Sequence, residues 1–233
     1  MLAIISGASK GIGRAMAFAF AKEGFDLALG ARTFSDLEVL KHQLASSYPK
    51  IKIFIKQVDF SVKQEVSLFA REVKTQWEGV SVIINNVGTY TTGTVSNEKE
   101  GILETIINTN LYSAYYLTRP FLEGMKKAQS GHIFNICSVV KTDPRAEAAS
   151  YSISKIALLG FNKVLFEEMR QYNVKVMAVL PGSVNTSSWD GMDAPKEEFI
   201  QPEDVVAAVL CAYKMSKYSV VEEIIIKPVN KKI

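Results

Sequence analysis

The sequence contains little that would indicate an extracellular, metal-binding or membrane protein. Its 233 residues include two cysteines and two histidines, and Cys137 and Cys211 lack the spacing of a metal site or a disulfide framework. No apolar run reaches the roughly 18 residues that a membrane-spanning helix needs. No charged segment followed by an apolar stretch precedes the first predicted strand. We therefore expect a soluble cytoplasmic protein with reduced thiols and no bound metal.

Charge of one sign is not concentrated anywhere in the chain. Lysine and arginine number 27 against 24 aspartate and glutamate residues, which gives a formal net charge of +3. Without a basic run, we expect neither nucleic acid nor a membrane surface as a partner, although a few cations could serve a phosphate-bearing ligand. The chain is 48% hydrophobic, enough to bury one sizeable core. We expect a single domain over residues 1–233.

Short apolar runs alternate with longer helical patterns along the chain, which indicates strands separated by helices. The strands are expected at residues 2–6, 25–30, 51–58, 80–84, 132–138, 174–180 and 220–226. The helices are expected at residues 15–22, 35–47, 62–77, 102–127 (one helix or two), 151–172 and 203–215. This order predicts an α/β fold with a seven-stranded parallel sheet covered by helices on both faces.

The first thirteen residues contain a strand, a glycine turn and a helix start. Gly7, Gly11 and Gly13 follow the apolar run 2–6 with the spacing G-x-x-x-G-x-G. The unpaired N–H groups at a helix N-terminus attract anions, and glycines let a diphosphate approach the backbone. The spacing differs from G-x-G-x-x-G and from a P-loop. A plain strand-to-helix turn is the alternative.

Ligands of parallel sheets bind at the carboxyl ends of the strands. This rule selects the segments that can carry chemistry, and each of them contains unusual residues. After the glycine turn these are Arg32 and Thr33, Asp59 and Phe60, residues 85–88, Ser138, and residues 181–186.

Tyr151 and Lys155 are four residues apart, so they share one face of a predicted helix that is reached from a strand end. An ammonium close to a phenol is expected to lower the pKa of the tyrosine from about 10, which suits a general acid or base. Ser138 leaves the same sheet edge and could hydrogen-bond a substrate carbonyl. A surface pair and an ordinary loop serine are the alternatives. A serine hydrolase is disfavoured because no G-x-S-x-G motif is present.

Taken in order, these segments resemble the classical short-chain dehydrogenase/reductase family over essentially the whole chain. The resemblance implies a Rossmann-type, doubly wound sheet and an oxidoreductase that interconverts a carbonyl and an alcohol. The matching residues are Gly7, Gly11, Gly13, Asp59, residues 85–88, Asn110, Ser138, Tyr151, Lys155, Pro181, Gly182 and Thr186.

The resemblance also implies a role for each catalytic residue. Tyr151 would donate a proton to the carbonyl oxygen while a nicotinamide donates hydride, and Ser138 would polarise the carbonyl. Lys155 would bind the nicotinamide ribose and lower the tyrosine pKa, and Asn110 would hold a water in a proton relay. The expected cofactor-binding residues are Gly7, Ser9, Lys10, Gly11, Ile12, Gly13, Arg32, Asp59, Phe60, Asn86, Gly88, Tyr151, Lys155, Pro181, Gly182, Val184 and Thr186.

The end of the second predicted strand bears on the choice of cofactor. An acidic residue there would bind the ribose hydroxyls of NAD and repel a 2′-phosphate. The sequence has Ala31 and Arg32 instead. Arg32 and Lys10 are expected to flank a 2′-phosphate, as a bidentate and a point-charge partner. We expect NADP(H) rather than NAD(H), and the alternative is that both residues are surface cations.

Residues 89–95, 139–150 and 187–201 are expected to line the substrate pocket, and the last segment is either a closing lid or an insertion. The resemblance implies a homodimer or homotetramer packed through helices 102–127 and 151–172, although their apolar faces could equally be core. A catalytically silent nucleotide-sensing or partner-binding protein on the same fold is the alternative function.

Overall fold

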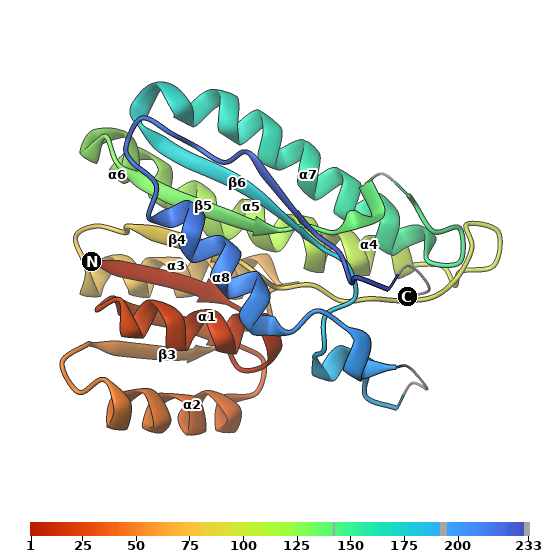
Figure 1. The fold of residues 1–233 in the computed structure, drawn as a ribbon, viewed down its shortest axis with the longest axis horizontal. Helices are drawn as coiled ribbons and strands as arrows, with labels where there is room; N and C mark the ends of the chain where they lie inside the picture. The colour runs from red at the N-terminus through yellow and green to blue at the C-terminus, as the bar shows by residue number, and fades with distance from the viewer. Residues whose placement is uncertain (142, 192–194, 231–233) are drawn as a thin grey trace.

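One sheet of seven parallel strands forms the centre of the computed structural model, which describes residues 1–141, 143–191 and 195–230. The strand order is β3-β2-β1-β4-β5-β6-β7, so the order reverses beside β1. All carboxyl ends lie at one edge, at the right of Figure 1. The predicted fold class is confirmed. The strands are β1 (Leu2–Ser6), β2 (Asp26–Ala31), β3 (Ile53–Gln57), β4 (Val82–Asn85), β5 (Gly131–Ile136), β6 (Val174–Pro181) and β7 (Glu223–Ile226).

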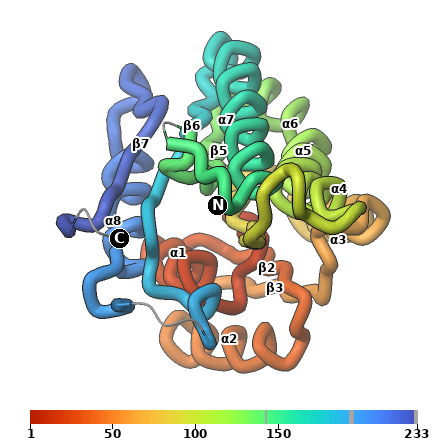
Figure 2. The backbone as a smooth tube through the Cα atoms, turned by 90° about the vertical axis from the view of Figure 1, so that its right-hand side faces the viewer, coloured from red at the N-terminus to blue at the C-terminus, as the bar shows by residue number. Residues whose placement is uncertain are grey.

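Helices cover both faces of the sheet, as Figures 1 and 2 show. Helices α1, α2 and α8 pack on one face, and α3 to α7 pack on the other. The helices are α1 (Gly11–Lys22), α2 (Phe34–Ser47), α3 (Lys63–Gln76), α4 (Ile102–Ile107), α5 (Ser113–Thr118), α6 (Leu122–Ala128), α7 (Ala149–Met169) and α8 (Pro202–Tyr213). Within the described residues, no helix has both the length and the apolar character needed to cross a membrane.

Strand β1 shows why both faces must be covered. All five of its residues are buried. Ala3 and Ile5 belong to the core under α1, α2 and α8, whereas Leu2 and Ile4 belong to the core under α3 and α7. Successive side chains of a strand point to opposite faces, so a continuous apolar run requires an apolar layer on each side.

The segment predicted as one or two helices at 102–127 is broken into more pieces. A π-helical turn, Asn108–Tyr112, separates α4 from α5, and a 3-10 turn, Arg119–Phe121, separates α5 from α6. Pro120 explains the second break because it has no N–H for the helix ladder. Other predicted boundaries shift by a few residues. β5 ends at Ile136 instead of 138, which leaves Ser138 in the loop beyond the strand.

A chain of buried polar side chains ties the centre of the sheet to its helices. The Asn85 amide donates to Thr118 Oγ1 and to Asn135 Oδ1, both at 2.8 Å. Asn135 then donates to Asn162 Oδ1 at 2.8 Å. Buried polar groups are costly unless paired, so these bonds favour one register of β4, β5, α5 and α7. The loops that follow β4 and β5 therefore start from fixed positions.

Candidate active site

The glycine turn after β1 is held by the loop after β4. The Asn86 side chain donates to the carbonyl oxygens of Ser6 and Gly7 at 3.1 and 3.0 Å, and its backbone N–H donates to Ser6 Oγ at 3.0 Å. Gly7 and Gly11 have φ values of +64° and +52°, a left-handed conformation that favours glycine. The turn is thus a rigid part of the sheet edge.

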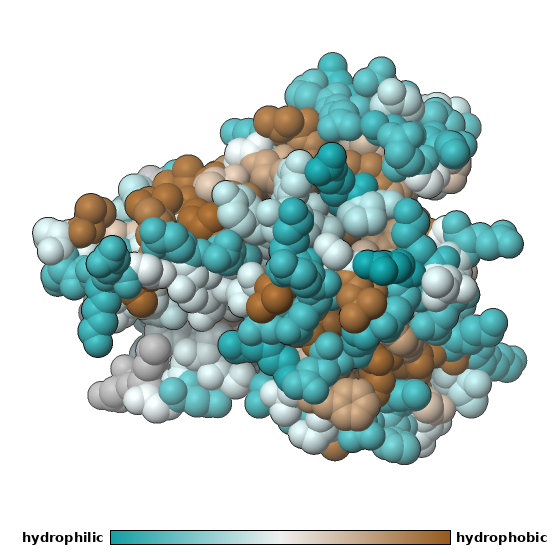
Figure 3. All heavy atoms as spheres, turned by 180° about the vertical axis from the view of Figure 1, so that it is seen from behind, coloured by the Kyte–Doolittle hydropathy of each residue, from teal (hydrophilic) through white to brown (hydrophobic). Residues whose placement is uncertain are grey.

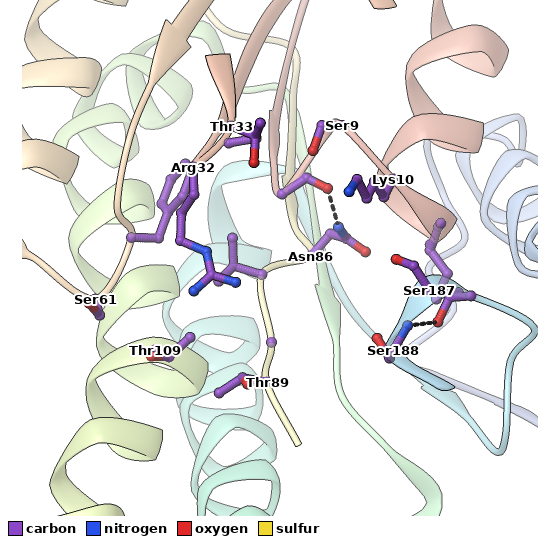
Figure 4. Close-up of a pocket in the computed structure, with 18 of the residues that line it drawn as sticks. Ser9, Lys10, Arg32, Thr33, Ser61, Asn86, Thr89, Thr109, Ser187 and Ser188 are labelled. Carbon is purple, nitrogen blue, oxygen red and sulfur yellow. Dashed lines mark hydrogen bonds between the residues drawn. The ribbon is translucent and has the colours of Figure 1, made fainter. Parts of the chain in front are cut away.

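The turn presents the N-terminus of α1 to a cavity of about 530 Å³. Within the described chain, no side chain caps this helix and no acidic residue lies in its first turn. Its orphan N–H groups and its dipole therefore favour an anion. Figure 4 shows Ser9, Lys10, Arg32, Thr33 and Asn86 around this space.

Gly13 contributes to the site by packing. A Cβ atom at Gly13 would overlap the carbonyl oxygen of Gly7 and crowd the Asn86 amide. The residue lies beneath the turn and is absent from the described walls of the two cavities. Gly13 therefore supports the turn from beneath, and its expected part in cofactor binding stays a prediction.

Arg32 extends from the end of β2 towards the space between Ser61 and Asn86 (Figure 4). Asp59 lines the same cavity, and its Oδ1 accepts hydrogen bonds from the backbone N–H and the hydroxyl of Ser61 at 2.9 and 2.7 Å. The Ser61 hydrogen bonds, with a smaller contribution from the charge of Arg32, lower the pKa of the Asp59 carboxyl. Asp59 is therefore ionised and already paired at neutral pH.

Lys10 has a partner that the sequence did not suggest. Its Nζ lies 3.2 Å from Asp36 Oδ2, in the first turn of α2. The Lys10 side chain is 60% exposed, and exposed ion pairs are weak. Lys10 therefore reaches the expected phosphate region with part of its charge compensated by Asp36. Arg32 is the stronger candidate for binding an anion there.

A second cavity of about 180 Å³ adjoins the first, and Ile12, Gly88, Thr186 and Ser188 line both. The Tyr90 and Tyr151 rings meet edge to face in this region, with centroids 5.0 Å apart. The other wall residues are Ile136, Cys137, Lys155, Pro181, Gly182, Ser183, Val184 and Trp189. The space next to the Tyr151 phenol is therefore small and partly aromatic.

The pKa of Tyr151 differs from the expectation. Burial raises the pKa of the phenol above its ordinary value, and a hydrogen bond with Ser138 opposes this effect. The sequence predicts that the Lys155 ammonium lowers this pKa, and the raised pKa shows that the prediction is wrong. Lys155 Nζ donates to the Ile136 carbonyl at 2.8 Å instead. Tyr151 therefore keeps its proton at neutral pH.

Lys155 is a buried amine at the floor of the second cavity. Its side chain passes close to Gly88, where a Cβ atom would lie 3.1 Å from Nζ. Burial lowers the pKa of Lys155 to about 8. The hydrogen bond to Ile136 fixes the head group, and the lowered pKa makes the neutral amine accessible near physiological pH.

Asn110 lies in the π-helical turn and is fully buried. Its Oδ1 accepts from the Thr89 N–H at 2.8 Å, and its Nδ2 donates to the Thr89 carbonyl at 3.0 Å and to Ser154 Oγ at 2.9 Å. Both amide hydrogens are thus used by the protein. Within the side chain, one Oδ1 lone pair remains for the relay water expected from the sequence. The side chain connects the loop after β4 to α7.

Ser138 and Cys137 follow β5 and are both buried. Ser138 Oγ accepts from the Val140 N–H at 3.4 Å and hydrogen-bonds Tyr151. Burial raises the pKa of the Cys137 thiol to about 12, so it stays protonated. Neither Ser138 nor Asn110 belongs to the described cavity walls, and Ser138 reaches the site through Tyr151.

Most predicted residues meet along the two cavities. Apart from Gly13, every residue expected to bind the cofactor lines one of them. Thr105 and Thr109 also line the first cavity but were missed, because they come from α4 and the π-helical turn instead of a strand end. Their four-residue spacing on a helix that follows β4 was the available signal.

The segments expected to line the substrate pocket have different outcomes. Tyr90 from residues 89–95 and Trp189 from residues 187–201 line the second cavity. The described residues of 139–150 are missing from its wall, and residue 142 lies outside the described residues. Val139–Lys141 form a 3-10 turn, and Lys141 pairs with Glu223 of β7. Residues 192–194 of the expected lid lie outside the described residues.

The sequence and the fold match those of known proteins. A family model described as short chain dehydrogenase matches residues 1–197. Sepiapterin reductase from Chlorobaculum tepidum is 31% identical over 235 residues, which cover 97% of this chain and 96% of that protein. An alcohol dehydrogenase from the archaeon Thermococcus sibiricus, complexed with 5-hydroxy-NADP, matches with a TM-score of 0.90 and 28% identity, over 98% of this chain and 96% of that one. A metagenomic short-chain oxidoreductase in complex with NADP matches with a TM-score of 0.86 and 28% identity, over 99% of this chain and 98% of that one.

Replacing Lys155 by methionine is expected to stabilise the protein at neutral pH. Burial lowers the pKa of this amine from 10.5 to about 8, so keeping it protonated in the folded state costs roughly 3 kcal/mol at pH 7. The cost disappears as the pH rises from 8 towards 10. The variant's advantage in the free energy of unfolding should therefore be largest at pH 7 and shrink at pH 9.5, as measured in urea. Lys127→Met, at an exposed position, should show no such pattern, and a variant less stable than wild type at pH 7 would contradict the expectation.

Proposed function

This chain belongs to the short-chain dehydrogenase family, and we propose that it is an NADP(H)-dependent oxidoreductase that interconverts a carbonyl and an alcohol by hydride transfer. The observation that carries the proposal is the junction of two cavities. A glycine turn and a helix N-terminus border the first, and Tyr151 and Lys155 line the second. A dinucleotide lying across the junction would bring its reactive ring to Tyr151.

The first cavity fits the phosphates of a dinucleotide. The uncapped start of α1 offers N–H groups to a diphosphate. Gly11 leaves no room for a larger residue between the turn and Thr186, since a Cβ atom at Gly11 would lie 2.8 Å from the Thr186 side chain. Gly7, Ser9, Ile12, Asn86 and Thr186 would hold the phosphates and ribose rings, and Val184, Gly182 and Pro181 would border the nicotinamide.

When bound, the cofactor would supply or accept the hydride. The Tyr151 phenol, which burial keeps protonated, donates its proton to the carbonyl oxygen during reduction and takes it back during oxidation. Ser138, hydrogen-bonded to Tyr151, polarises the carbonyl. Lys155 would bind the nicotinamide ribose from its site on the Ile136 carbonyl. Asn110 keeps Thr89 and Ser154 in place beside these groups.

The end of β2 supports NADP(H) over NAD(H). Ala31 ends the strand, and Arg32 follows it into the cavity. Neither position holds an acidic residue that would bind the ribose hydroxyls. A guanidinium offers paired donors to a 2′-phosphate. Two structurally similar proteins at 28% identity form complexes with 5-hydroxy-NADP and NADP, which supports the same choice.

Turnover with a panel of carbonyl compounds tests the proposed reaction. We expect the protein to oxidise NADPH in the presence of some aldehydes, ketones or 3-oxoacyl thioesters, and Tyr151→Phe to lower kcat at least a hundredfold because the proton donor is lost. The Tyr151→Phe protein should still bind NADPH, which fluorescence titration checks. NADPH binding without turnover across the whole panel would favour a catalytically silent nucleotide-sensing or partner-binding protein.

Charge reversal at Arg32 tests the choice of cofactor. We expect Arg32→Glu to reduce kcat/KM for NADPH at least tenfold, because the 2′-phosphate loses its paired donors and meets a like charge. The kcat/KM for NADH should change much less, so the ratio of kcat/KM for NADPH to kcat/KM for NADH decides between the two cofactors. Arg71→Glu changes the net charge equally at an exposed position of α3 and should leave the ratio unchanged. A wild-type preference for NADH would overturn the NADP(H) proposal.

We also propose that a second copy of the chain packs against α4, α5 and α7. Figure 3 shows apolar side chains gathered along the upper edge of this face, in the region of α7. Val164 of α7 is 69% exposed, and Leu103, Tyr112, Ile153 and Ile156 are each exposed by about two fifths. Contiguous exposed apolar surface favours association.

Light scattering is expected to give two or four times the mass of the 25.8 kDa chain. Val164→Glu should shift the particle towards the monomer mass, because burying an unpaired carboxylate is costly. Val39→Glu, at an exposed position of α2, is the matched control. A monomeric wild type would contradict the assembly.

A further inference from the structure

Helix α7, which carries Tyr151 and Lys155, receives its N-terminal cap from a distant residue. Its N-cap position is Ala148, which has no side-chain acceptor, and its first turn contains no acidic residue. Glu98 supplies the acceptor from 52 positions earlier in the chain. Its Oε1 accepts the Ser150 backbone N–H at 3.1 Å, and its Oε2 accepts the Ser150 hydroxyl. A carboxylate is also the charge that the positive end of a helix dipole favours.

The backbone around Glu98 is shaped for this contact. Gly93 has a φ of +149°, a conformation that L side chains rarely adopt, and a Cβ atom there would overlap the Cγ of Glu98. Gly93 also forms two backbone hydrogen bonds with the entry of α7. Its N–H donates to the Glu147 carbonyl at 2.8 Å, and its carbonyl accepts the Ala149 N–H at 2.9 Å. The segment 89–98 is therefore fastened to the start of α7 by backbone and side chain together.

The other end of the segment 89–98 reaches the Tyr151 phenol. Thr89 is bound through its backbone to Asn110, and the next residue, Tyr90, places its ring 5.0 Å from the ring of Tyr151. Tyr151 directly follows Ser150, the residue that Glu98 holds. The position of the phenol is thus set from both sides by one segment, which is anchored at Asn110 and at Glu98.

We propose that Glu98 is a positioning residue for Tyr151. By capping the first turn of α7 and fixing the segment 89–98, Glu98 holds the Tyr151 phenol against Tyr90 and in line with the substrate carbonyl. The inference rests on the proposed oxidoreductase function. A displacement of a reacting group by about 1 Å is enough to reduce a rate substantially. Glu98 lies outside the described walls of both cavities, so its effect is on the catalytic step and not on cofactor binding.

The test compares Glu98→Ala, Glu98→Gln and Glu100→Ala, the last at an exposed position two residues beyond the segment 89–98. We expect Glu98→Ala to lower kcat about tenfold while KM for NADPH stays within twofold of the wild-type value. Glu98→Gln should keep at least half of the wild-type kcat, because its amide oxygen still accepts the Ser150 N–H and its amide group can donate to the hydroxyl. Glu100→Ala should match the wild type.

Two further measurements report on the contact itself. Hydrogen exchange of the backbone amides of residues 149–152 should become faster in Glu98→Ala than in Glu98→Gln, because the cap is lost only in the former. Ser150→Ala removes one of the two hydrogen bonds and should lower kcat less than Glu98→Ala. The loss in the double variant Glu98→Ala/Ser150→Ala should not exceed that of Glu98→Ala alone, as expected for residues that act through one contact.

A wild-type kcat in Glu98→Ala would overturn the positioning role. It would equally be overturned if Glu98→Ala and Glu98→Gln lost the same activity, or if kcat and NADPH affinity fell together with thermal stability. Failure of the proposed function has a different signature, since the wild-type protein itself would then show no turnover on the carbonyl panel. An active wild type with an unaffected Glu98→Ala variant therefore rejects the role of Glu98 alone.

Discussion

The reversal of strand order beside β1 is the constraint on which the site depends. β1 pairs with β2 on one side and β4 on the other. The chain leaves β1 towards α1 on one face of the sheet and leaves β4 towards α4 on the other face. A crevice opens where the two connections diverge, and the first cavity lies there. The Asn86 amide bridges the crevice at its base by bonding Ser6 and Gly7. The glycine turn is thus fixed relative to the loop that leads to Tyr90.

The two cavities differ in their electrostatics because their titratable groups differ in burial. The first is larger and charged, with Arg32 and Asp59 in its wall and the positive end of α1 at one side. The second is small, and burial raises the pKa of Tyr151 and lowers that of Lys155 to about 8. Burial favours the neutral form of both groups. The Tyr151 phenol is therefore protonated near physiological pH, the form that the proposed role as proton donor requires.

Precision at Tyr151 comes from residues that are remote in sequence. Asn110 reaches Thr89 and Ser154 from a π-helical turn, a feature often found at functional sites. Below them, the buried bonds among Asn85, Asn135 and Asn162 hold β4, β5 and α7 together. Breaking any of these buried hydrogen bonds would leave a further polar group unpaired, which resists small displacements of α7. Helix α7, which carries Tyr151, is therefore held at its centre as well as at its start.

The sequence by itself determined the seven-stranded parallel sheet, the helices on both faces and the family, because apolar periodicity and glycine spacing are local signals. It also predicted which strand ends would gather at one edge. Only the tertiary structure decided that Gly13 packs instead of lining a cavity, that Lys10 pairs with Asp36, and that burial raises the pKa of Tyr151. Such contacts and desolvation depend on neighbours that are distant in the chain. No spacing rule connects Glu98 to Ser150, because the folded backbone alone brings them together.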